Sequence, residues 1–273
     1  MRPASVRSLV FVLEMFPSRA TVGQGLWSEG IIMFGRCLVA WSLGRTTRVF
    51  ARFGTLFWVA AIAAGATGSA SAQDRRQNTP GEFDFYVLSL SWSPSFCEEV
   101  AERGNGGRSQ QAQCGGRPFS FVVHGLWPQY ERGFPEYCDR DSWLDRNIMT
   151  SMLDLMPAPG LIFNEWKKHG TCSGLGPRGY FETIRKARAA VKIPPEFIDL
   201  ADPKTISPTE IEDAFIKVNP GLPAAAIAVT CNRSRLSEVR ICMGKDLQFR
   251  ACDEIDRRAC RRDQVTMPPV RGG

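Results

Sequence analysis

The chain has 273 residues, with 34 Lys and Arg against 28 Asp and Glu, and a formal net charge of +6. Seven arginines and two glutamates fall in residues 1–72, so the remaining residues carry 27 basic and 26 acidic side chains, a net charge of +1. A nearly neutral chain does not hold nucleic acid through bulk charge. This weighs against a tight nucleic-acid-binding protein and leaves room for an enzyme that contacts a few phosphates.

Residues 1–72 predict a leader with a signal peptide. Three arginines at 45–52 precede an apolar run at 55–64 that is too short to span a bilayer, and Ala-Ser-Ala at 70–72 fits a cleavage site. A membrane anchor is the alternative, which the short apolar run disfavours, and Met33 is a second possible start. We therefore expect the leader to be removed, the protein to be secreted or periplasmic, and no stable membrane association to remain.

The first half of the remaining chain predicts two strands. After a polar segment at 73–82 that we expect to be flexible, residues 83–92 come close to alternation and are rich in strong β formers, which predicts a strand. Residues 101–116 are rich in Gly, Gln, Arg and Ser and indicate an exposed loop. The apolar run 118–123 predicts a second strand that ends at His124, where the imidazole could project into a cleft.

Helices are predicted in the middle of the chain. Apolar residues at helical spacing predict helices at 141–156, 163–169 and 177–191. The sequence Ser-Pro-Thr-Glu at 207–210 is a capping box with proline at the first helical position, which predicts the start of another helix. Residues 194–206 predict an irregular connection.

Strands return towards the C-terminus. The runs 225–231, 236–243 and 247–252 predict strands, the last two as a hairpin, and we expect the tail at 263–273 to be loose. Strands and helices are mixed without regular βαβ alternation. The predicted fold class is therefore α+β, with a central antiparallel β-sheet, helices packed against it and disulfide stabilisation, in a single domain at 83–262.

Eight cysteines remain once Cys37 of the leader is set aside, an even number that is typical of disulfide bonds in an exported protein. They are Cys97, Cys114, Cys138, Cys172, Cys231, Cys242, Cys252 and Cys260. The residues alone leave their pairing open. A zinc site is the alternative, which the lack of a C-x-x-C pair and of paired histidines disfavours. We expect no metal and no cofactor.

The chain has only two histidines, His124 and His169. If residues 163–169 are helical, Glu165 and His169 share one face and Lys168 lies close to it. An imidazole can give or take a proton near neutral pH, and a lysine can hold an anion. This set favours acid–base chemistry at a phosphate. Taken singly, the motif at 163–169 could equally be a surface helix with a buried histidine, and His124 alone would more readily be a core histidine bonded to backbone.

The sequences His-Gly-Leu-Trp-Pro at 124–128 and Glu-Trp-Lys-Lys-His-Gly-Thr-Cys at 165–172 resemble the two signature segments of the ribonuclease T2 family. Residues 83–97 and 236–247 extend the resemblance over roughly residues 83–260. It implies an α+β fold and metal-independent cleavage of single-stranded RNA. In this reaction the ribose 2′-hydroxyl attacks its own 3′-phosphate, which gives a 2′,3′-cyclic phosphate and then a 3′-phosphate. The resemblance also implies the disulfide pairs Cys138–Cys172, Cys231–Cys260 and Cys242–Cys252, with Cys97–Cys114 as the remaining pair.

The resemblance further implies the roles of the catalytic residues. His169 would be the general base and His124 the general acid, with the roles exchanged in the second step, while Glu165 and Lys168 would stabilise a phosphorane-like transition state. The family usually has a histidine where this chain has Asn164. An asparagine can donate a hydrogen bond but carries no charge at low pH, so we expect weaker substrate binding or a shifted pH optimum.

Candidate base-binding residues follow the first histidine. Trp127 is the candidate for base stacking, with core packing as an equal alternative. Tyr130, Phe134 and Tyr137 could complete that site. Gln129 stands where many relatives have an acidic residue that reads the base, so the base preference is open. We expect a monomer that acts on single-stranded RNA. The rival hypotheses are a secreted binding protein that has lost catalysis and a metal-dependent phosphodiesterase.

Overall fold

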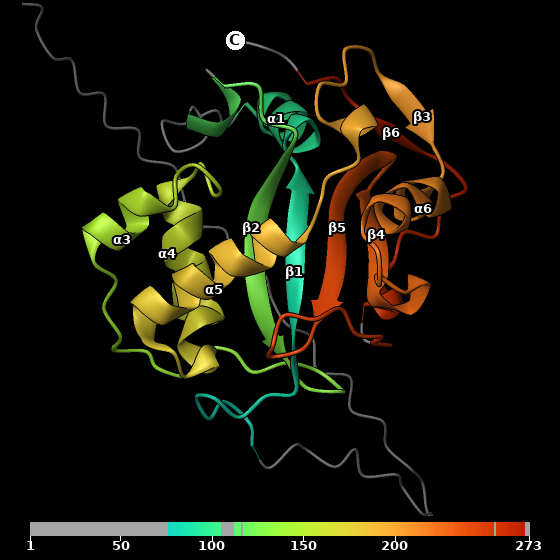
Figure 1. Cartoon of the computed structure of the whole chain (residues 1–273). Helices are drawn as coiled ribbons and strands as arrows, with labels where there is room; N and C mark the ends of the chain where they lie inside the picture. The colour runs from blue at the N-terminus through green and yellow to red at the C-terminus, as the bar shows by residue number, and fades with distance from the viewer. Residues whose placement is uncertain (1–75, 105–111, 116, 254, 271–273) are drawn as a thin grey trace, which may run out of the picture. The chain divides into compact units, whose positions relative to one another are not determined.

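The computed structural model describes residues 76–104, 112–115, 117–253 and 255–270 (Figure 1). Its α-helices are α1 (Ser93–Glu102), α3 (Arg146–Ser151), α4 (Pro159–Lys168), α5 (Gly176–Ala190) and α6 (Pro208–Val218). Its strands are β1 (Phe85–Trp92), β2 (Phe121–Gln129), β3 (Lys204–Ile206), β4 (Ile227–Asn232), β5 (Arg235–Met243) and β6 (Val265–Met267). Short 3₁₀ helices are η1 (Gly170–Ser173), η2 (Pro195–Phe197), η3 (Ala224–Ala226) and η4 (Asp256–Arg258).

Strand β1 lies at the centre of the described sheet, between β2 and β5 and antiparallel to both. The order of the sheet is β2-β1-β5-β6-β3, and β4 pairs with β5. All pairings are antiparallel except one parallel bridge between Arg235 of β5 and Thr266 of β6. This arrangement confirms the predicted α+β class. It also brings β2 and β5, which are far apart in the sequence, within one strand of each other.

The helices cover the sheet on the side of β2 and on the side of β4. Figure 1 shows α3, α4 and α5 gathered beside β2, and α6 beside β4. Helix α5 buries Tyr180, Phe181, Ile184 and Ala187, which recur at helical spacing and form one apolar stripe. Burying each large side chain of such a stripe contributes about 1.5–3 kcal/mol. The predicted helix at 177–191 is therefore confirmed. Its buried stripe also helps to support α4.

Helix α6 begins as its capping box predicts. The Ser207 hydroxyl accepts a hydrogen bond from the Glu210 backbone N–H at 3.1 Å, and the Glu210 carboxylate accepts one from the Ser207 backbone N–H at 2.9 Å. Caps of this kind contribute about 1 kcal/mol. The helix then presents Ile211 and Phe215 to the core, where both are fully buried.

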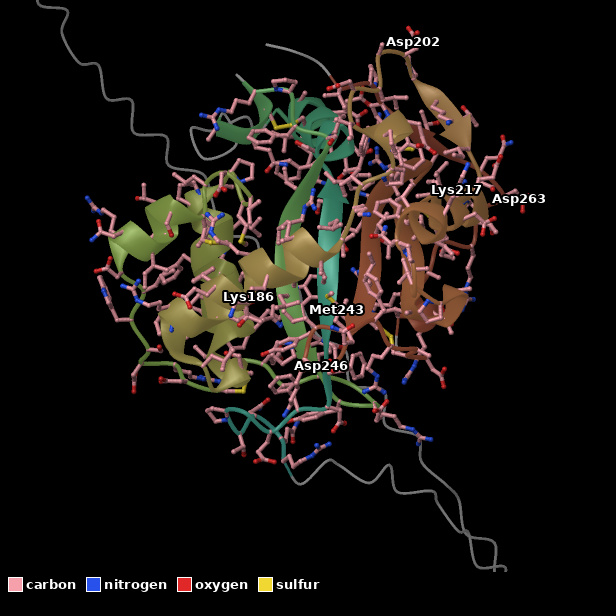
Figure 2. All side chains as sticks on the ribbon, in the orientation of Figure 1. Lys186, Asp202, Lys217, Met243, Asp246 and Asp263 are labelled. Carbon is pink, nitrogen blue, oxygen red and sulfur yellow. A yellow bond between two sulfur atoms is a disulfide. The ribbon has the colours of Figure 1, made fainter. Side chains whose placement is uncertain are left out.

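Side chains sort clearly between the inside and the outside of the described domain. In Figure 2, Met243 at the end of β5 is enclosed, whereas Lys186 of α5, Lys217 of α6 and Asp263 lie at the surface. The same apolar core contains Trp92, whose indole N–H donates to the Pro268 carbonyl at 3.0 Å. The core therefore reaches from the central strand to the C-terminal segment.

The four disulfides implied by the family resemblance all form. They are Cys97–Cys114, Cys138–Cys172, Cys231–Cys260 and Cys242–Cys252. The widest loop is closed by Cys138–Cys172, with a sequence separation of 34. A cross-link of this length stabilises a fold by about 4 kcal/mol in the chain-entropy account. It also fixes the segment that directly follows α4.

Two predicted elements have other boundaries. The helix expected at 141–156 is confined to α3 and a following turn, because the Asp145 side chain caps it late by accepting from the Asn147 backbone N–H at 2.7 Å. The strand expected at 118–123 is β2, which begins later and continues through His124 to Gln129. His124 therefore lies within a strand and not at its end, since the motif keeps pairing with β1 beyond it.

The predicted strand at 247–252 is wrong. Only one bridge forms there, between Met243 and Phe249, because the Gly244 and Leu247 backbones close a turn and Leu247 has a positive φ of 64°. The irregular connection expected at 194–206 contains η2 and ends in β3. Strand β3 forms because β6 supplies a partner from 59 to 63 residues further along the chain, a pairing that local sequence does not reveal.

Both terminal segments are more firmly held than expected. The part of the 73–82 segment that the structure describes, 76–82, bonds to the domain: the Tyr130 hydroxyl donates to the Arg76 carbonyl at 2.9 Å, and the Gly81 N–H donates to the Cys172 carbonyl at 2.9 Å. The tail at 263–273 is not loose over its described part. It forms β6, in which Val265 and Met267 are buried. Each segment is ordered by distant partners.

The predicted leader at 1–72 lies outside the described residues. Within the described part of the chain, no helix combines the length and the apolar character needed to cross a membrane.

Candidate active site

His124 lies at a β-bulge in β2. Val123 pairs with Leu90 and Gly125 pairs with Ser89, so His124 is the extra residue between two regular pairs. A bulge turns a side chain out of the regular alternation and is frequent next to active sites. The His124 side chain is 33% exposed, which leaves one side of the imidazole open.

Two carboxylates approach His124 from different elements. Glu238 of β5 contacts Nδ1 through its Oε1 atom, and Glu165 of α4 places its Oε1 atom 3.6 Å from Nε2. Glu165 is itself held by the Trp127 indole N–H, which donates to its Oε2 atom at 2.7 Å. Both carboxylates are buried. The imidazole is therefore held between β5 and α4.

His169 lies at the C-terminus of α4. It is the C-cap, with φ −115° and ψ −45°, and its backbone N–H donates to the Glu165 carbonyl at 2.9 Å. The side chain is buried, and no group of the described chain bonds to its Nδ1 atom. Its ring lies beside Trp127, with the ring centroids 5.4 Å apart. The predicted sharing of one turn by Glu165 and His169 is thus realised at the helix end.

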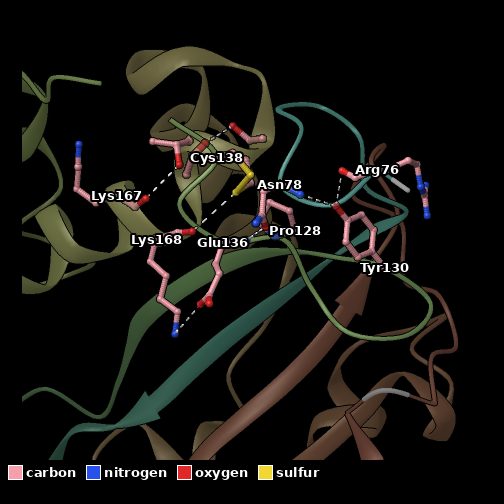
Figure 3. The surroundings of a disulfide bond; sticks show 12 residues. Arg76, Asn78, Pro128, Tyr130, Glu136, Cys138, Lys167 and Lys168 are labelled. Atoms are coloured by element: carbon pink, nitrogen blue, oxygen red, sulfur yellow. Dashed lines mark hydrogen bonds and ion pairs between the residues drawn. A yellow bond between two sulfur atoms is a disulfide. The ribbon is translucent and has the colours of Figure 1, made fainter. Parts of the chain in front are cut away.

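The Cys138–Cys172 disulfide fixes the chain around this helix end (Figure 3). The Tyr137 N–H donates to the Lys168 carbonyl at 2.9 Å, next to the cross-link. Lys168 directs its ammonium group towards Glu136, with an Nζ–Oε2 distance of 3.7 Å, and it remains 39% exposed. The disulfide therefore fixes the backbone at Lys168. The ammonium group of this residue lies at the edge of the site and remains accessible to solvent.

A pocket of about 240 Å³ joins these groups. Both histidines open into it, together with Glu165 and Lys168. The rest of its lining comes from both halves of the chain: Val87, Trp127, Gln129, Phe134, Arg240, Ile255 and Arg258. All four predicted catalytic residues therefore share one pocket.

The two imidazoles have opposite pKa shifts. Burial lowers the pKa of His169 from 6.5 to about 3, and the charges of Lys168 and His124 act in the same direction. Desolvation also opposes protonation of His124, but the hydrogen bond and charge of Glu238, with the charge of Glu165, outweigh it and raise the His124 pKa above 6.5. At mildly acidic pH, His169 is therefore neutral and His124 is protonated.

The pKa values of the two buried carboxyl groups, Glu165 and Glu238, are also shifted in opposite directions. Burial raises the pKa of Glu165 from 4.5 to about 6, against the opposing effects of His124 and Trp127. Burial acts in the same direction on Glu238, but its bonds to His124 and Arg240 outweigh it and lower the pKa of Glu238 to about 2. Glu238 is thus a carboxylate at mildly acidic and at neutral pH, whereas Glu165 gains a proton when the pH falls to about 6.

The predicted base-binding residues do not all lie in the pocket. Trp127 and Gln129 line it, and so does Phe134. Asn164 is exposed and lines a separate hollow on the other side of His124. Tyr130, also predicted to bind substrate, is not among the residues that line the pocket: its ring is buried, and its hydroxyl donates to the Arg76 carbonyl and accepts from the Asn78 backbone N–H (Figure 3). The described N-terminal segment therefore bonds to Tyr130 and holds its hydroxyl.

Sequence reasoning missed Glu238 and Arg240. The Arg240 guanidinium donates to the Glu238 Oε2 atom from Nε at 2.9 Å and from Nη2 at 2.7 Å, and it stacks over Trp127 at 5.0 Å. A signal was present: the two charged residues are spaced by two in β5, so they face one side of the strand. The sequence pattern alone does not reveal that this side of β5 faces His124.

The described residues hold no group of three or more His, Cys, Asp or Glu side chains arranged to bind a metal ion. The carboxylates of the pocket are instead bonded to His124, Trp127 and Arg240.

Comparison with known proteins identifies the family. The model of the Ribonuclease T2 family matches residues 83–252. The chain belongs to the Ribonuclease T2 family. The match contains both signature segments and Glu238, and it ends before Ile255 and Arg258, which line the pocket from the C-terminal side.

Relatives of the Ribonuclease T2 family include bacterial proteins. A ribonuclease of Aeromonas hydrophila is 44% identical over 109 residues, which are 40% of this chain and 46% of that protein. A probable ribonuclease of Haemophilus influenzae is 32% identical over 185 residues, 64% of this chain and 63% of that protein. The chain thus spans less than two thirds of the length of these two relatives. Ribonuclease I of Escherichia coli is 27% identical and is covered to 81%, with 65% of this chain aligned.

Solved structures share the Ribonuclease T2 fold. RNase NT in complex with 5′-AMP superposes with a TM-score of 0.53 at 24% identity, over 69% of this chain and 99% of that one. An RNase-related protein from Calystegia sepium superposes with a TM-score of 0.54 at 20% identity, over 70% of this chain and 99% of that one. At this identity the likeness shows the fold.

Proposed function

We propose that the protein is an endoribonuclease that cleaves single-stranded RNA. In the first step a ribose 2′-oxygen bonds to the adjacent phosphorus and the bond to the 5′-oxygen of the next nucleotide breaks. The products are a 2′,3′-cyclic phosphate and a 5′-hydroxyl end. In the second step water opens the cycle to a 3′-phosphate. The observation that carries this proposal is that both histidines of the chain line one pocket with Lys168.

The opposite protonation states of the two imidazoles support their roles. A pKa of about 3 leaves His169 neutral at mildly acidic pH, so it can accept the proton of the 2′-hydroxyl as general base. The raised pKa of His124 keeps its proton available for the leaving 5′-oxygen, as a general acid requires. Each positioned proton transfer is typically worth about 10²–10⁴-fold in rate. The second step exchanges the two roles.

Lys168 and Glu165 support the charged transition state. Negative charge grows on the non-bridging phosphate oxygens during attack, and the exposed ammonium of Lys168 at the pocket can neutralise it. Glu165, with a pKa of about 6, carries a proton at acidic pH and can then donate a hydrogen bond to the same oxygens. Its position is fixed by the Trp127 indole at 2.7 Å. This chain's own groups thus supply charge stabilisation.

Aromatic and amide side chains of the pocket support the binding of a stacked nucleobase there. Trp127 and Phe134 offer aromatic rings, and Gln129 offers an amide, although its Nε2 already donates to the Pro128 carbonyl at 2.9 Å. Stacking on an aromatic ring is worth about 1–3 kcal/mol per base and tolerates any base. The related RNase NT was crystallised with 5′-AMP, which is consistent with a nucleotide in such a pocket. Asn164 would contact a phosphate from the far side of His124.

We further propose that the protein acts as a monomer in an oxidising compartment, secreted or periplasmic. Four disulfides in the described domain support the oxidising compartment, because cytosolic proteins rarely keep structural disulfides.

One assay tests the activity. The disulfide-bonded protein is incubated with single-stranded RNA in excess EDTA, and in parallel with the matching 2′-deoxy strand. We expect cleavage of RNA to 2′,3′-cyclic phosphate ends and no cleavage of the deoxy strand. Intact RNA would contradict the proposal and favour a binding protein that has lost catalysis. Cleavage that EDTA abolishes would instead favour a metal-dependent phosphodiesterase.

Variants of the two histidines complete the test. His124→Ala and His169→Ala are each expected to lower kcat by at least about 10²-fold, because each removes one proton transfer. Circular dichroism of both variants should match the wild-type protein. A folded variant that retains full turnover would contradict the assigned role of that histidine.

A further inference from the structure

Glu238 contacts the ring nitrogen of His124 that the proposed reaction does not use. Its Oε1 atom meets Nδ1, and Nε2 points instead towards Glu165 and the pocket. A neutral imidazole has one N–H and one acceptor nitrogen, and the bond at one nitrogen decides which form is present. A carboxylate at Nδ1 therefore keeps a proton on that nitrogen and leaves Nε2 to exchange protons with the substrate.

Glu238 is itself fixed by Arg240. Two N–H groups of the guanidinium hold its Oε2 atom, at 2.9 and 2.7 Å, so each carboxylate oxygen has its own partner. Both residues belong to β5, where their spacing of two places them on the same face of the sheet. The same guanidinium stacks on Trp127 with its carbon 5.0 Å from the ring. Strand β5 thus carries both residues that support the Nδ1 side of the imidazole.

We propose that Glu238, held by Arg240, is the positioning residue for His124, which sets the tautomer, orientation and proton affinity of the general acid. This inference rests on the proposed RNA cleavage. Neither residue touches the reacting atoms in this scheme, since both act through the imidazole. Buried charge pairs of this kind hold their geometry when both partners are present.

Several charged groups face His124 from the elements packed around it. Glu238 and Arg240 come from β5, and Glu165, Lys168 and His169 come from α4 and its C-terminus. Glu238 favours the protonated imidazole most strongly among them, and Arg240 opposes it. Removing the charge of Glu238 should therefore lower the proton affinity of His124, and removing the charge of Arg240 should raise it.

The small number of histidines allows a direct measurement. With only two imidazoles in the chain, proton NMR should show two histidine Hε1 resonances, one from each ring, and His169→Asn assigns them. We expect the His124 signal to titrate above pH 6.5 in the wild-type protein. In Glu238→Gln the midpoint should fall by about 1–3 units, the usual effect of losing a close opposite charge. In Arg240→Gln it should rise.

Activity gives a second readout. Glu238→Gln keeps an acceptor for Nδ1 and should cleave RNA at pH 4.5 within a few-fold of the wild-type rate. At pH 7 its kcat/KM should fall about tenfold for each unit by which the His124 midpoint drops, because less of the general acid is protonated. Glu238→Ala removes the acceptor as well and should lose activity at both pH values. A purely structural role predicts equal losses at both pH values for both variants.

Glu212→Gln is the matched control. Glu212 lies on α6, is partly buried, accepts from the Val229 N–H at 2.9 Å and is not among the residues that line the pocket. The same isosteric change there should leave the His124 midpoint and the pH profile unchanged. An unchanged His124 midpoint in Glu238→Gln would overturn the inference, even in an active enzyme. Wild-type protein that leaves RNA intact would instead contradict the proposed function, which the NMR titration does not measure.

Discussion

Gly125 lies directly against the carboxyl group of Glu165. A methyl group on the Gly125 α-carbon would lie 2.8 Å from the Glu165 carboxyl carbon and 2.5 Å from the Trp127 indole nitrogen. The lack of a side chain at Gly125, in the first histidine motif, therefore leaves the space that the Glu165 carboxyl group of the second motif occupies. Strand β2 and helix α4 can approach each other only because this position has no side chain, and their approach brings the two histidines into one pocket.

Gly125→Ala should consequently damage the site more than the fold. The methyl group would displace the Glu165 carboxylate and break its bond to Trp127, and a misplacement of about 1 Å can cost about 10²-fold in rate. We expect kcat/KM for RNA to fall by about that factor. Gly160→Ala, on α4, is the control for the effect of an added methyl group on stability, because a methyl group there would point into open space. A Gly125→Ala enzyme with wild-type kcat/KM would contradict the argument.

The rate of cleavage should follow a bell-shaped pH profile with an acidic optimum. His169 must be neutral, and its pKa of about 3 places the lower limb near that pH. His124 must be protonated, and its raised pKa places the upper limb above pH 6.5. Measurement of kcat/KM between pH 2.5 and pH 9 on a dinucleotide substrate tests this. A rate that climbs steadily through pH 6.5 towards pH 9 is incompatible with the assignment.

Asn164→His should strengthen substrate binding only at acidic pH. The residue lines a hollow beside His124, and a histidine there would be protonated below about pH 6.5. A charged hydrogen bond to phosphate is worth about 1.5–3 kcal/mol, so we expect KM at pH 5 to fall about tenfold with little change in kcat. Asn164→Gln, which stays neutral, is the control. An equal fall of KM at pH 8 would argue against a charge effect.

The C-terminal strand should contribute strongly to stability. Met267 of β6 is fully buried, and truncating such a side chain to alanine typically costs about 2–5 kcal/mol. We expect Met267→Ala to lower the free energy of unfolding by that amount in urea denaturation. Gln264→Ala, at an exposed position just before the strand, should change it by less than about 0.5 kcal/mol. Equal free energies of unfolding for the two variants would support the original expectation of a loose tail.

Some features of this protein follow from short stretches of sequence. The capping box at Ser207, the apolar stripe of α5 and the strong β formers of β1 are each readable within a few residues, so their elements could be predicted. The two histidine motifs indicated acid–base chemistry, because an imidazole in a chain with few histidines is informative. The fold class followed from the order of these elements.

Other features depend on residues that are distant in the chain. Glu238 reaches His124 across 114 positions, and it does so because β1 pairs with both β2 and β5. The same kind of long-range packing buries Tyr130 under the N-terminal segment and pairs β6 with β3. Sequence alone determined which residues can carry the chemistry, since chemistry belongs to side-chain types. Only the tertiary structure decided which charges surround each imidazole, because those distances are set by strand pairing and helix packing.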